Sequence, residues 1–230
     1  MIIFFDLDDT LMDHASAMRS AAIGLHSMTP KSSNIDEFIL KWLQAQRRYY
    51  PRYLNGELSY QETSRLRIRE AIANETSDEE ADKLFSDYLK LYRSEWKLFP
   101  DALPCLDRLT ACTLGVITNG PSSEQRSKIR ILGIEDRFQH IVVSEEVGHA
   151  KPDPRIFHHA CELTAAPSSE VIYVGDVLEI DIHGACNAGL RGIWLNRHET
   201  DGQTIDAEMV TSLFELSNLI ESKQDGRQHL

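Results

Sequence analysis

Three aspartates follow a short apolar run at the start of the chain. The run Ile2–Phe5 is typical of a buried strand, and Asp6, Asp8 and Asp9 come directly after it. Carboxylates this close repel one another and resist the loss of water unless a cation or a proton compensates their charge. We therefore expect a hard metal ion, most simply Mg2+, beside Asp6 and Asp8, and a carboxylate that could act as a nucleophile. The alternative is a plain turn that caps the next helix.

Polar side chains also follow the other apolar runs of the chain. They supply a hydroxyl, an amide, a cation and two carboxylates: Thr118, Asn119, Lys151, Asp176 and Asp181. Because open parallel sheets bind ligands at the carboxyl ends of their strands, we expect these groups to converge with Asp6 and Asp8. Each has a plainer interpretation by itself: Thr118 as a helix cap, Lys151 as a solvated lysine and Asp176 as a turn residue.

The elements that must position these residues belong to two regions of the chain, which differ in their predicted secondary structure. Most of the chain alternates short β-rich runs with helical patterns, which predicts βαβ units and a parallel sheet. The expected strands are 2–5, 114–117, 141–143, 171–174 and 193–195, and the expected helices between them are 123–132, 154–163 and 182–188. Residues 14–98 instead read as almost wholly helical, with Ser77 and Glu80 typical of a capping box. Residues 222–230 are expected to be a frayed tail.

Composition narrows the class of protein. The 230 residues are 42% hydrophobic and 26% charged, as in ordinary globular domains, and no apolar run approaches the ~20 residues of a membrane span. The net charge of -12 argues against binding to a nucleic acid polymer, which needs a basic surface. The start of the chain lacks a basic leader, and the four cysteines show no disulfide or zinc-finger spacing. We expect buried, reduced thiols and a cytoplasmic location.

The ordered motifs resemble those of the haloacid dehalogenase-like (HAD) hydrolase superfamily. They are Phe5-Asp6-Leu7-Asp8-Asp9-Thr10, Ile117-Thr118-Asn119-Gly120, Lys151-Pro152-Asp153-Pro154, and Val174-Gly175-Asp176 through Asp181. The resemblance implies an α/β fold with a Rossmann-like parallel sheet flanked by helices. It also implies a hydrolase core formed by 1–13 and 99–230, with 14–98 inserted as an all-helical cap domain. The stretches 125–133 and 144–157 look like the branch that contains nucleotidases and N-acylneuraminate phosphatases.

The resemblance also implies a role for each site residue. Asp6 would be the nucleophile that forms an aspartyl-phosphate, and Asp8 the general acid and then the base. Mg2+ would lie at Asp6, Asp176 and the main-chain carbonyl of Asp8, and Asp181 would support the metal or Lys151. The phosphoryl oxygens would be held by the Thr118 hydroxyl, the main-chain amide of Asn119 and Lys151. Val177 and Ile180 stand where many relatives carry Ser and Asn, which affects the surroundings of the carboxylates rather than the carboxylates themselves.

A basic stretch within 41–70 suggests how a substrate could be selected. It holds seven basic residues against three acidic ones, with aromatic residues interleaved. We expect one or two of Arg47, Arg48 and Arg52 to contact an anionic or ring-bearing substrate. The plainer alternative is a solvated helical face over an aromatic core.

The leading hypothesis is a Mg2+-dependent phosphatase that acts on a small phosphorylated metabolite, a nucleoside monophosphate or a sugar phosphate. Its partners would be that metabolite alone, with no nucleic acid polymer and no membrane, and the protein would be a monomer or a homodimer. The alternatives are a phosphomutase of the same superfamily, a haloacid dehalogenase and a non-catalytic binding protein. The resemblance makes dehalogenation the weaker one, because the dehalogenases lack an aspartate at the position of Asp8.

Overall fold

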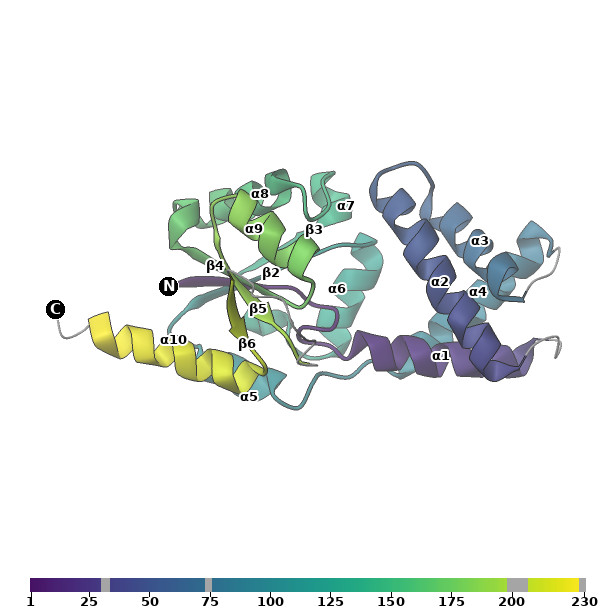
Figure 1. Ribbon diagram of the computed structural model, residues 1–230, viewed down its shortest axis with the longest axis horizontal. Helices are drawn as coiled ribbons and strands as arrows, with labels where there is room; N and C mark the ends of the chain where they lie inside the picture. The colour runs from purple at the N-terminus through teal and green to yellow at the C-terminus, as the bar shows by residue number, and fades with distance from the viewer. Residues whose placement is uncertain (30–33, 73–75, 198–206, 228–230) are drawn as a thin grey trace. The chain divides into compact units, whose positions relative to one another are not determined.

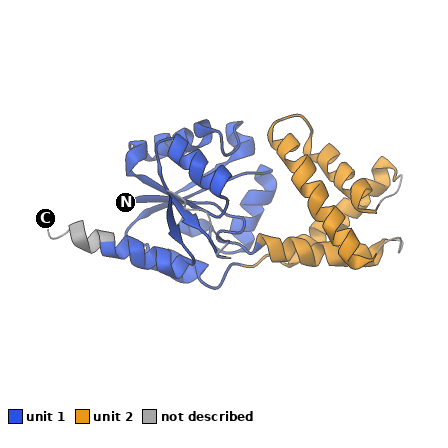
Figure 2. Ribbon diagram, viewed as in Figure 1, with its two compact units in different colours: residues 1–13, 98–230 blue, residues 14–97 orange. Residues whose placement is uncertain are grey.

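The chain forms two compact units, shown in Figure 2. The computed structural model describes residues 1–29, 34–72, 76–197 and 207–227, the last five of these by their backbone alone. The sheet unit comprises Met1–Asp13 and Leu98–Leu230, and the helical unit comprises His14–Lys97. No helix within the described residues is both long and apolar enough to cross a membrane.

A parallel sheet forms the centre of the sheet unit (Figure 1). In the described part of the chain it has six strands in the order β3-β2-β1-β4-β5-β6, and every neighbouring pair is parallel. The strands are β1 (Ile2–Phe5), β2 (Thr113–Thr118), β3 (His140–Val143), β4 (Val171–Gly175), β5 (Arg191–Leu195) and β6 (Glu208–Val210). The first strand of the chain therefore lies in the middle of the sheet, between β2 and β4.

Helices cover both faces of this sheet, as its buried apolar strands require. They are α5 (Ala102–Arg108), α6 (Ser122–Ile131), α7 (Ser144–Val147), α8 (Pro154–Thr164), α9 (His183–Asn187) and α10 (Leu213–Arg227). A π-helical turn (Leu178–Ile182) and two 3-10 turns (Glu135–Arg137 and Ser168–Glu170) complete the connections. In Figure 1, α8 and α9 lie on one face and α5 and α10 on the other. Phe4, Phe157 and Tyr173 are fully buried between the sheet and its helices.

The α/β fold with a parallel sheet is confirmed, and three expectations were wrong in detail. The edge strand β6 was not predicted, because its three residues, Glu-Met-Val, carry too short an alternation to stand out. The expected frayed tail is helical as far as Arg227, while 228–230 lie outside the described residues. Cys105, Cys112 and Cys161 are buried as expected, but Cys186 is exposed at the surface of α9.

The helical unit is built from α1 (His14–Met28), α2 (Ile35–Leu54), α3 (Tyr60–Ile72) and α4 (Asp78–Ser94). Its core is aromatic: Trp42 stacks on Phe38 and lies 4.5 Å from the ring of Tyr88. The Ser77 hydroxyl accepts a hydrogen bond from the backbone N–H of Glu80, so the predicted cap of α4 is present.

Candidate active site

The ends of β1, β2 and β4 bring the predicted residues to one edge of the sheet. Phe5 pairs with Val116 on one side and with Val174 on the other, so Asp6 lies near the carboxyl ends of both neighbouring strands. The backbone N–H of Asp6 donates to the carbonyl of Val174 at 2.8 Å, which continues the pairing one residue beyond β1. The parallel pairing of the three strands therefore fixes the position of the Asp6 backbone, from which the carboxylate side chain projects.

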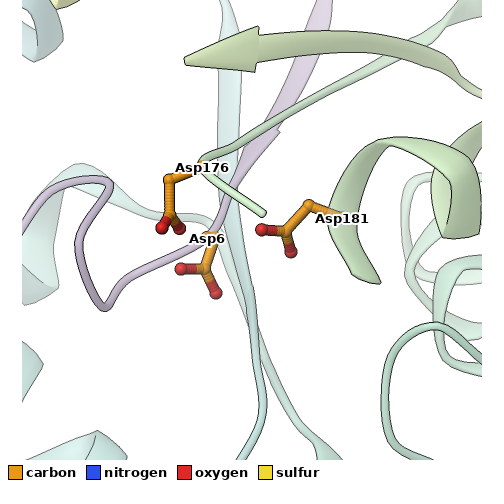
Figure 3. Close-up of side chains that lie close together, drawn as sticks. All are labelled: Asp6, Asp176 and Asp181. Atoms are coloured by element: carbon orange, nitrogen blue, oxygen red, sulfur yellow. The ribbon is translucent and has the colours of Figure 1, made fainter. Parts of the chain in front are cut away.

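Three carboxylates converge at this edge. One oxygen from each of Asp6, Asp176 and Asp181 lies within 4.8 Å of the others, and Figure 3 shows the three side chains directed toward one another. Asp6 and Asp181 are buried, and Asp176 is half-buried. The Thr10 hydroxyl donates to Asp176 at 3.3 Å, and the Trp194 indole donates to its main-chain oxygen at 2.8 Å. The hydrogen bond from Trp194 fixes the backbone that carries the Asp176 carboxylate.

The negative charge of the three carboxylates, when all are ionised, exceeds the positive charge of the ammonium group beside them. Burial raises the pKa of Asp6 to about 7, against the opposing effect of the Lys151 ammonium. Burial also raises the pKa of Asp176 to about 9, and the negative charges of Asp6 and Asp181 add to the rise. Three ionised carboxylates around one ammonium leave two negative charges in excess. An all-oxygen set with that excess fits a hard divalent cation such as Mg2+.

Lys151 is the buried cation of the site. Its side chain is 3% exposed, and its ammonium donates to Asp6, to Asp181 at 2.7 Å and to the Tyr173 hydroxyl at 2.7 Å. Burial alone would lower the pKa of Lys151, but the carboxylates of Asp181 and Asp6 outweigh it and raise that pKa. Lys151 therefore stays charged at neutral pH beside Asp6.

The Asn119 side chain holds the backbone of Lys151 rather than reaching toward the carboxylates. Its amide oxygen accepts from the Lys151 N–H at 2.8 Å, and its amide nitrogen donates to the Lys151 carbonyl at 2.9 Å. This pair of bonds joins the loop after β2 to the loop that carries Lys151. The cis peptide bond between Lys151 and Pro152 lies in the same loop.

Thr118 does not cap the next helix, so the plainer interpretation of this residue was wrong. The cap position of α6 is taken by Pro121, and Thr118 is buried at the end of β2. Its hydroxyl oxygen instead accepts a hydrogen bond from the side-chain amide of Gln125. A hydroxyl that accepts a hydrogen bond still has its own hydrogen to donate, so Thr118 remains able to act as a donor.

The Asp8 side chain is directed toward α6 rather than into the carboxylate cluster. Its two oxygens accept from the Lys128 ammonium at 2.9 and 2.7 Å, and one of them also accepts from the Gln125 amide at 3.2 Å. A quarter of the Asp8 side chain remains exposed. Asp9, next to it, has a left-handed backbone with φ of 60° in the turn that follows β1.

Sequence reasoning missed several residues that contact this site, among them Gln125, Lys128 and Tyr173. The helical spacing of polar residues in the sequence could have indicated two of them, Gln125 and Lys128. Gln125, Lys128, Ile129 and Leu132 repeat with the period of a helix, so an amide and an ammonium occupy the stripe that a helix normally buries. Tyr173 gave no such signal, because a tyrosine within an apolar strand is ordinary core composition.

The three arginines proposed for substrate selection lie on the exposed part of α2 in the helical unit. Arg48 pairs with Glu70 at 3.0 Å and Arg52 with Glu57 at 3.1 Å, while Arg47 is exposed to solvent. The arginine of the basic stretch that is buried is Arg67, whose guanidinium lies 4.3 Å from the centre of the Trp42 ring.

Comparison with known proteins gives a family and several relatives. A family model described as haloacid dehalogenase-like hydrolase matches residues 1–189. The chain is 32% identical to the pyrimidine 5'-nucleotidase YjjG of Escherichia coli (strain K12), over 95% of this chain and 96% of that protein. It is 30% identical to the N-acylneuraminate-9-phosphatase of Rattus norvegicus, over 96% and 93% of the two chains.

Solved structures agree on the fold. The magnesium-bound HAD-hydrolase YfnB from Bacillus subtilis superposes with a TM-score of 0.79 at 23% identity, over 95% of this chain and 97% of that one. A 2-haloacid dehalogenase from Pseudomonas syringae pv. Tomato DC3000 superposes with a TM-score of 0.68 at 28% identity, over 96% and 98%. Proteins that share this fold therefore differ in chemistry, and the side chains at the strand ends must decide it.

The carboxylate cluster predicts a pH-dependent response to Mg2+. Because the folded pKa values of Asp6 and Asp176 lie above the unfolded value of about 3.9, metal-free stability falls as pH rises from about 4 through 7 to 9. Mg2+ replaces the protons, so we expect it to raise Tm more at pH 8 than at pH 5.5. At a hundredfold excess over Kd the stabilisation is about 2.7 kcal/mol. Asp176→Asn is the control, in which we expect Mg2+ to raise Tm by less. Equal rises in Tm at both pH values in the unsubstituted protein would contradict the prediction.

A second prediction concerns Gly175, where the backbone closely approaches Asp181. A Cβ atom at Gly175 would lie 2.5 Å from the Asp181 Cβ and Cγ atoms. We expect Gly175→Ala to displace Asp181 and to lower the free energy of unfolding by about 1–3 kcal/mol in a urea titration. The control is Gly24→Ala in α1, where the new methyl group meets only the mobile end of Leu91. Equal stability of the two variants would show that the close approach is unimportant.

Proposed function

The chain belongs to the haloacid dehalogenase-like hydrolases, and we propose that it is a Mg2+-dependent phosphatase of small phosphorylated metabolites that works through an aspartyl-phosphate. The observation that carries this proposal is the Asp6 carboxylate, buried at the end of the central strand and bonded to the Lys151 ammonium. Lys151 is itself fixed by Asp181 and Tyr173, so positive charge stands beside the attacking group before a substrate arrives.

The first chemical step transfers the phosphoryl group to Asp6. An Asp6 oxygen attacks phosphorus in line with the leaving oxygen, and the bond between phosphorus and that oxygen breaks as the new bond forms. The leaving oxygen takes a proton from the Asp8 carboxyl group, so the alcohol departs neutral. The hydroxyl of Thr118 and the ammonium of Lys151 hold the phosphoryl oxygens and balance their charge.

The second step releases phosphate. A water molecule attacks phosphorus from the side that the alcohol has left, and Asp8 takes the proton that the water gives up. The bond between phosphorus and Asp6 then breaks, which restores the carboxylate of Asp6 and the carboxyl group of Asp8. The two aspartates thus end the cycle in the states in which they began it.

Asp6, Asp176 and the main-chain carbonyl of Asp8 are the groups that we propose hold Mg2+. The oxygen-only donor set and the two excess negative charges support a divalent cation there. When bound, the ion supplies positive charge that keeps Asp6 ionised and draws charge from the phosphoryl oxygens. Asp181 already accepts from Lys151, Tyr173 and the Val177 N–H, which supports a role in orienting Lys151.

The substrate class follows from the relatives. Proteins named as a pyrimidine 5'-nucleotidase and an N-acylneuraminate-9-phosphatase match nearly the full chain at 30–32% identity, so we propose a nucleoside monophosphate or a sugar phosphate. We also propose a cytoplasmic protein, monomeric or homodimeric, without nucleic acid or membrane partners. The absence of disulfides from all four cysteines, each within the described residues, agrees with that location.

Dehalogenation is the second candidate, favoured by the likeness to a 2-haloacid dehalogenase structure. Cleaving a carbon–halogen bond releases a halide, which needs no proton. Asp8, bonded to two side chains of α6, could supply the proton that an alkoxide leaving group needs and a halide does not. The geometry therefore supports phosphoryl transfer better.

We expect Asp6→Asn to abolish phosphate release, with a loss of at least about 10³-fold in kcat, because the amide cannot attack phosphorus. The measurement is inorganic phosphate release from a panel of nucleoside monophosphates and sugar phosphates, with Mg2+ and with chelator. Asp9→Asn, which keeps a polar group in the same turn, is the matched control with near-normal activity. Full activity of Asp6→Asn would exclude the covalent route, and halide release from 2-haloacids that exceeds phosphate release would replace the phosphatase with a dehalogenase.

The helical unit is the proposed substrate-selecting cap, and its exposed arginines give a separate test. Replacing Arg47, Arg48 and Arg52 together with alanine should lower kcat/KM on the best substrate by about tenfold, through the loss of ion pairing with an anionic substrate. The same variant should keep its activity on a small phosphate ester with no charge beyond its phosphate group, such as p-nitrophenyl phosphate. Unchanged kcat/KM on the best substrate would assign these arginines to a solvated surface.

A further inference from the structure

A buried lysine on α6 holds the carboxylate that we propose exchanges protons with the substrate. The Lys128 side chain is 1% exposed, and its ammonium bridges both oxygens of Asp8 at 2.9 and 2.7 Å. A second carboxylate, that of Glu124 one turn earlier on α6, lies 3.3 Å from the same ammonium. Glu124 therefore remains an anionic partner of Lys128 when Asp8 carries the proton, and both carboxylates compensate the ammonium when Asp8 is ionised.

This arrangement is costly for stability alone. Taking an ammonium out of water is unfavourable before pairing offsets the loss of hydration, and an apolar side chain of similar volume often serves a core equally well. The neighbouring position of the same buried stripe is filled by Ile129, so α6 does pack with apolar residues where nothing else is needed. A charge retained at this position therefore calls for a role other than packing.

Gln125 adds a second connection to the same carboxylate. It is 1% exposed, and its side-chain amide donates one hydrogen bond to Asp8 at 3.2 Å and another to the hydroxyl oxygen of Thr118. Both hydrogens of that amide are thereby used. Because Thr118 accepts from Gln125, its own hydrogen remains available for a phosphoryl oxygen. One buried side chain thus sets the direction of Asp8 and of Thr118 together.

We propose that Lys128 and Gln125 are positioning residues that fix the Asp8 carboxyl group for proton transfer to the leaving oxygen and couple it to Thr118. The proposal rests on the proposed phosphatase function. We assign neither residue a contact with the phosphoryl group or the leaving oxygen; each acts through the side chain of Asp8 or Thr118. A carboxyl group free to rotate away would be poorly placed for proton transfer, and small misplacements reduce rates strongly.

The leaving group separates this role from a merely structural one. A nitrophenolate departs without a proton, so forming the phosphoenzyme from p-nitrophenyl phosphate does not depend on where Asp8 points. A sugar alkoxide needs the proton, so the same step from ribose 5-phosphate does depend on it. General loss of structure would slow phosphorylation by both substrates alike.

The experiment measures the first turnover of the full chain with Mg2+ by rapid quench, with each of the two substrates. We expect Lys128→Met to slow phosphorylation by ribose 5-phosphate about tenfold or more, with phosphorylation by p-nitrophenyl phosphate within about twofold of normal. Water attack on the phosphoenzyme also needs Asp8, so this variant should show a burst of nitrophenolate followed by a slow steady state. Arg126→Met is the matched control, because Arg126 lies on the same helix but pairs with Glu146 at 2.6 Å.

Asp8→Asn distinguishes failure of this inference from failure of the proposed function. If Asp8→Asn slows both substrates equally, the acid role of Asp8 is wrong, and the positioning role is wrong with it. If Asp8→Asn is selective for ribose 5-phosphate but Lys128→Met is not, the positioning role alone is overturned. Should Lys128→Met fail to fold, Gln125→Met decides by the same ratio of the two rates: a selective loss of about threefold supports the role, and an unchanged ratio overturns it.

Discussion

The sheet unit depends on holding several carboxylates around one buried ammonium. Lys151 bonds to Asp6 and Asp181, and the cluster that includes Asp176 still carries an excess of negative charge when ionised. Like charges in a medium of low dielectric repel strongly, so this edge of the sheet is a poor contributor to stability and a strong site for a cation. Packing and hydrogen bonds elsewhere in the sheet unit must therefore offset the repulsion between these carboxylates.

The surrounding contacts show how that cost is met. The fully buried Phe4 and Tyr173 lie on the central strands beside the site, and the Tyr173 hydroxyl oxygen also accepts a hydrogen bond from Lys151. Asn119 ties the loop of Lys151 to the end of β2 through both of its amide atoms. Gly175 leaves room for Asp181 to approach the strand backbone. Packing below the edge and hydrogen bonds between loops together hold charges that would otherwise separate.

A second buried lysine repeats this principle with a different consequence. Lys128 on α6 fixes Asp8 as Lys151 fixes Asp6, and the two lysines reach the site from different connections of the sheet. The chain carries a net charge of -12, yet both of its site lysines are buried and fully paired with carboxylates. Neither the overall field nor these paired lysines would therefore attract an anionic substrate, and a divalent cation bound at the carboxylate cluster would supply the positive charge that does. Side chains at the strand ends thus distinguish this member among proteins of one fold.

The sequence by itself determined the parallel sheet, the strand ends at which polar residues gather and the family to which the chain belongs, because alternation of strands and helices and the order of motifs are local patterns. The contacts among those residues needed the tertiary structure. No local sequence pattern predicts that the Asp8 carboxylate pairs with Lys128 instead of joining the other carboxylates, or that Thr118 accepts a hydrogen bond from Gln125. Nor does any local pattern predict that the Asn119 side chain bonds to the backbone of a residue thirty-two positions away. Each of these is a choice among several possible hydrogen-bond partners, and only the packing of α6 and the loops against the sheet decides which partner lies within reach.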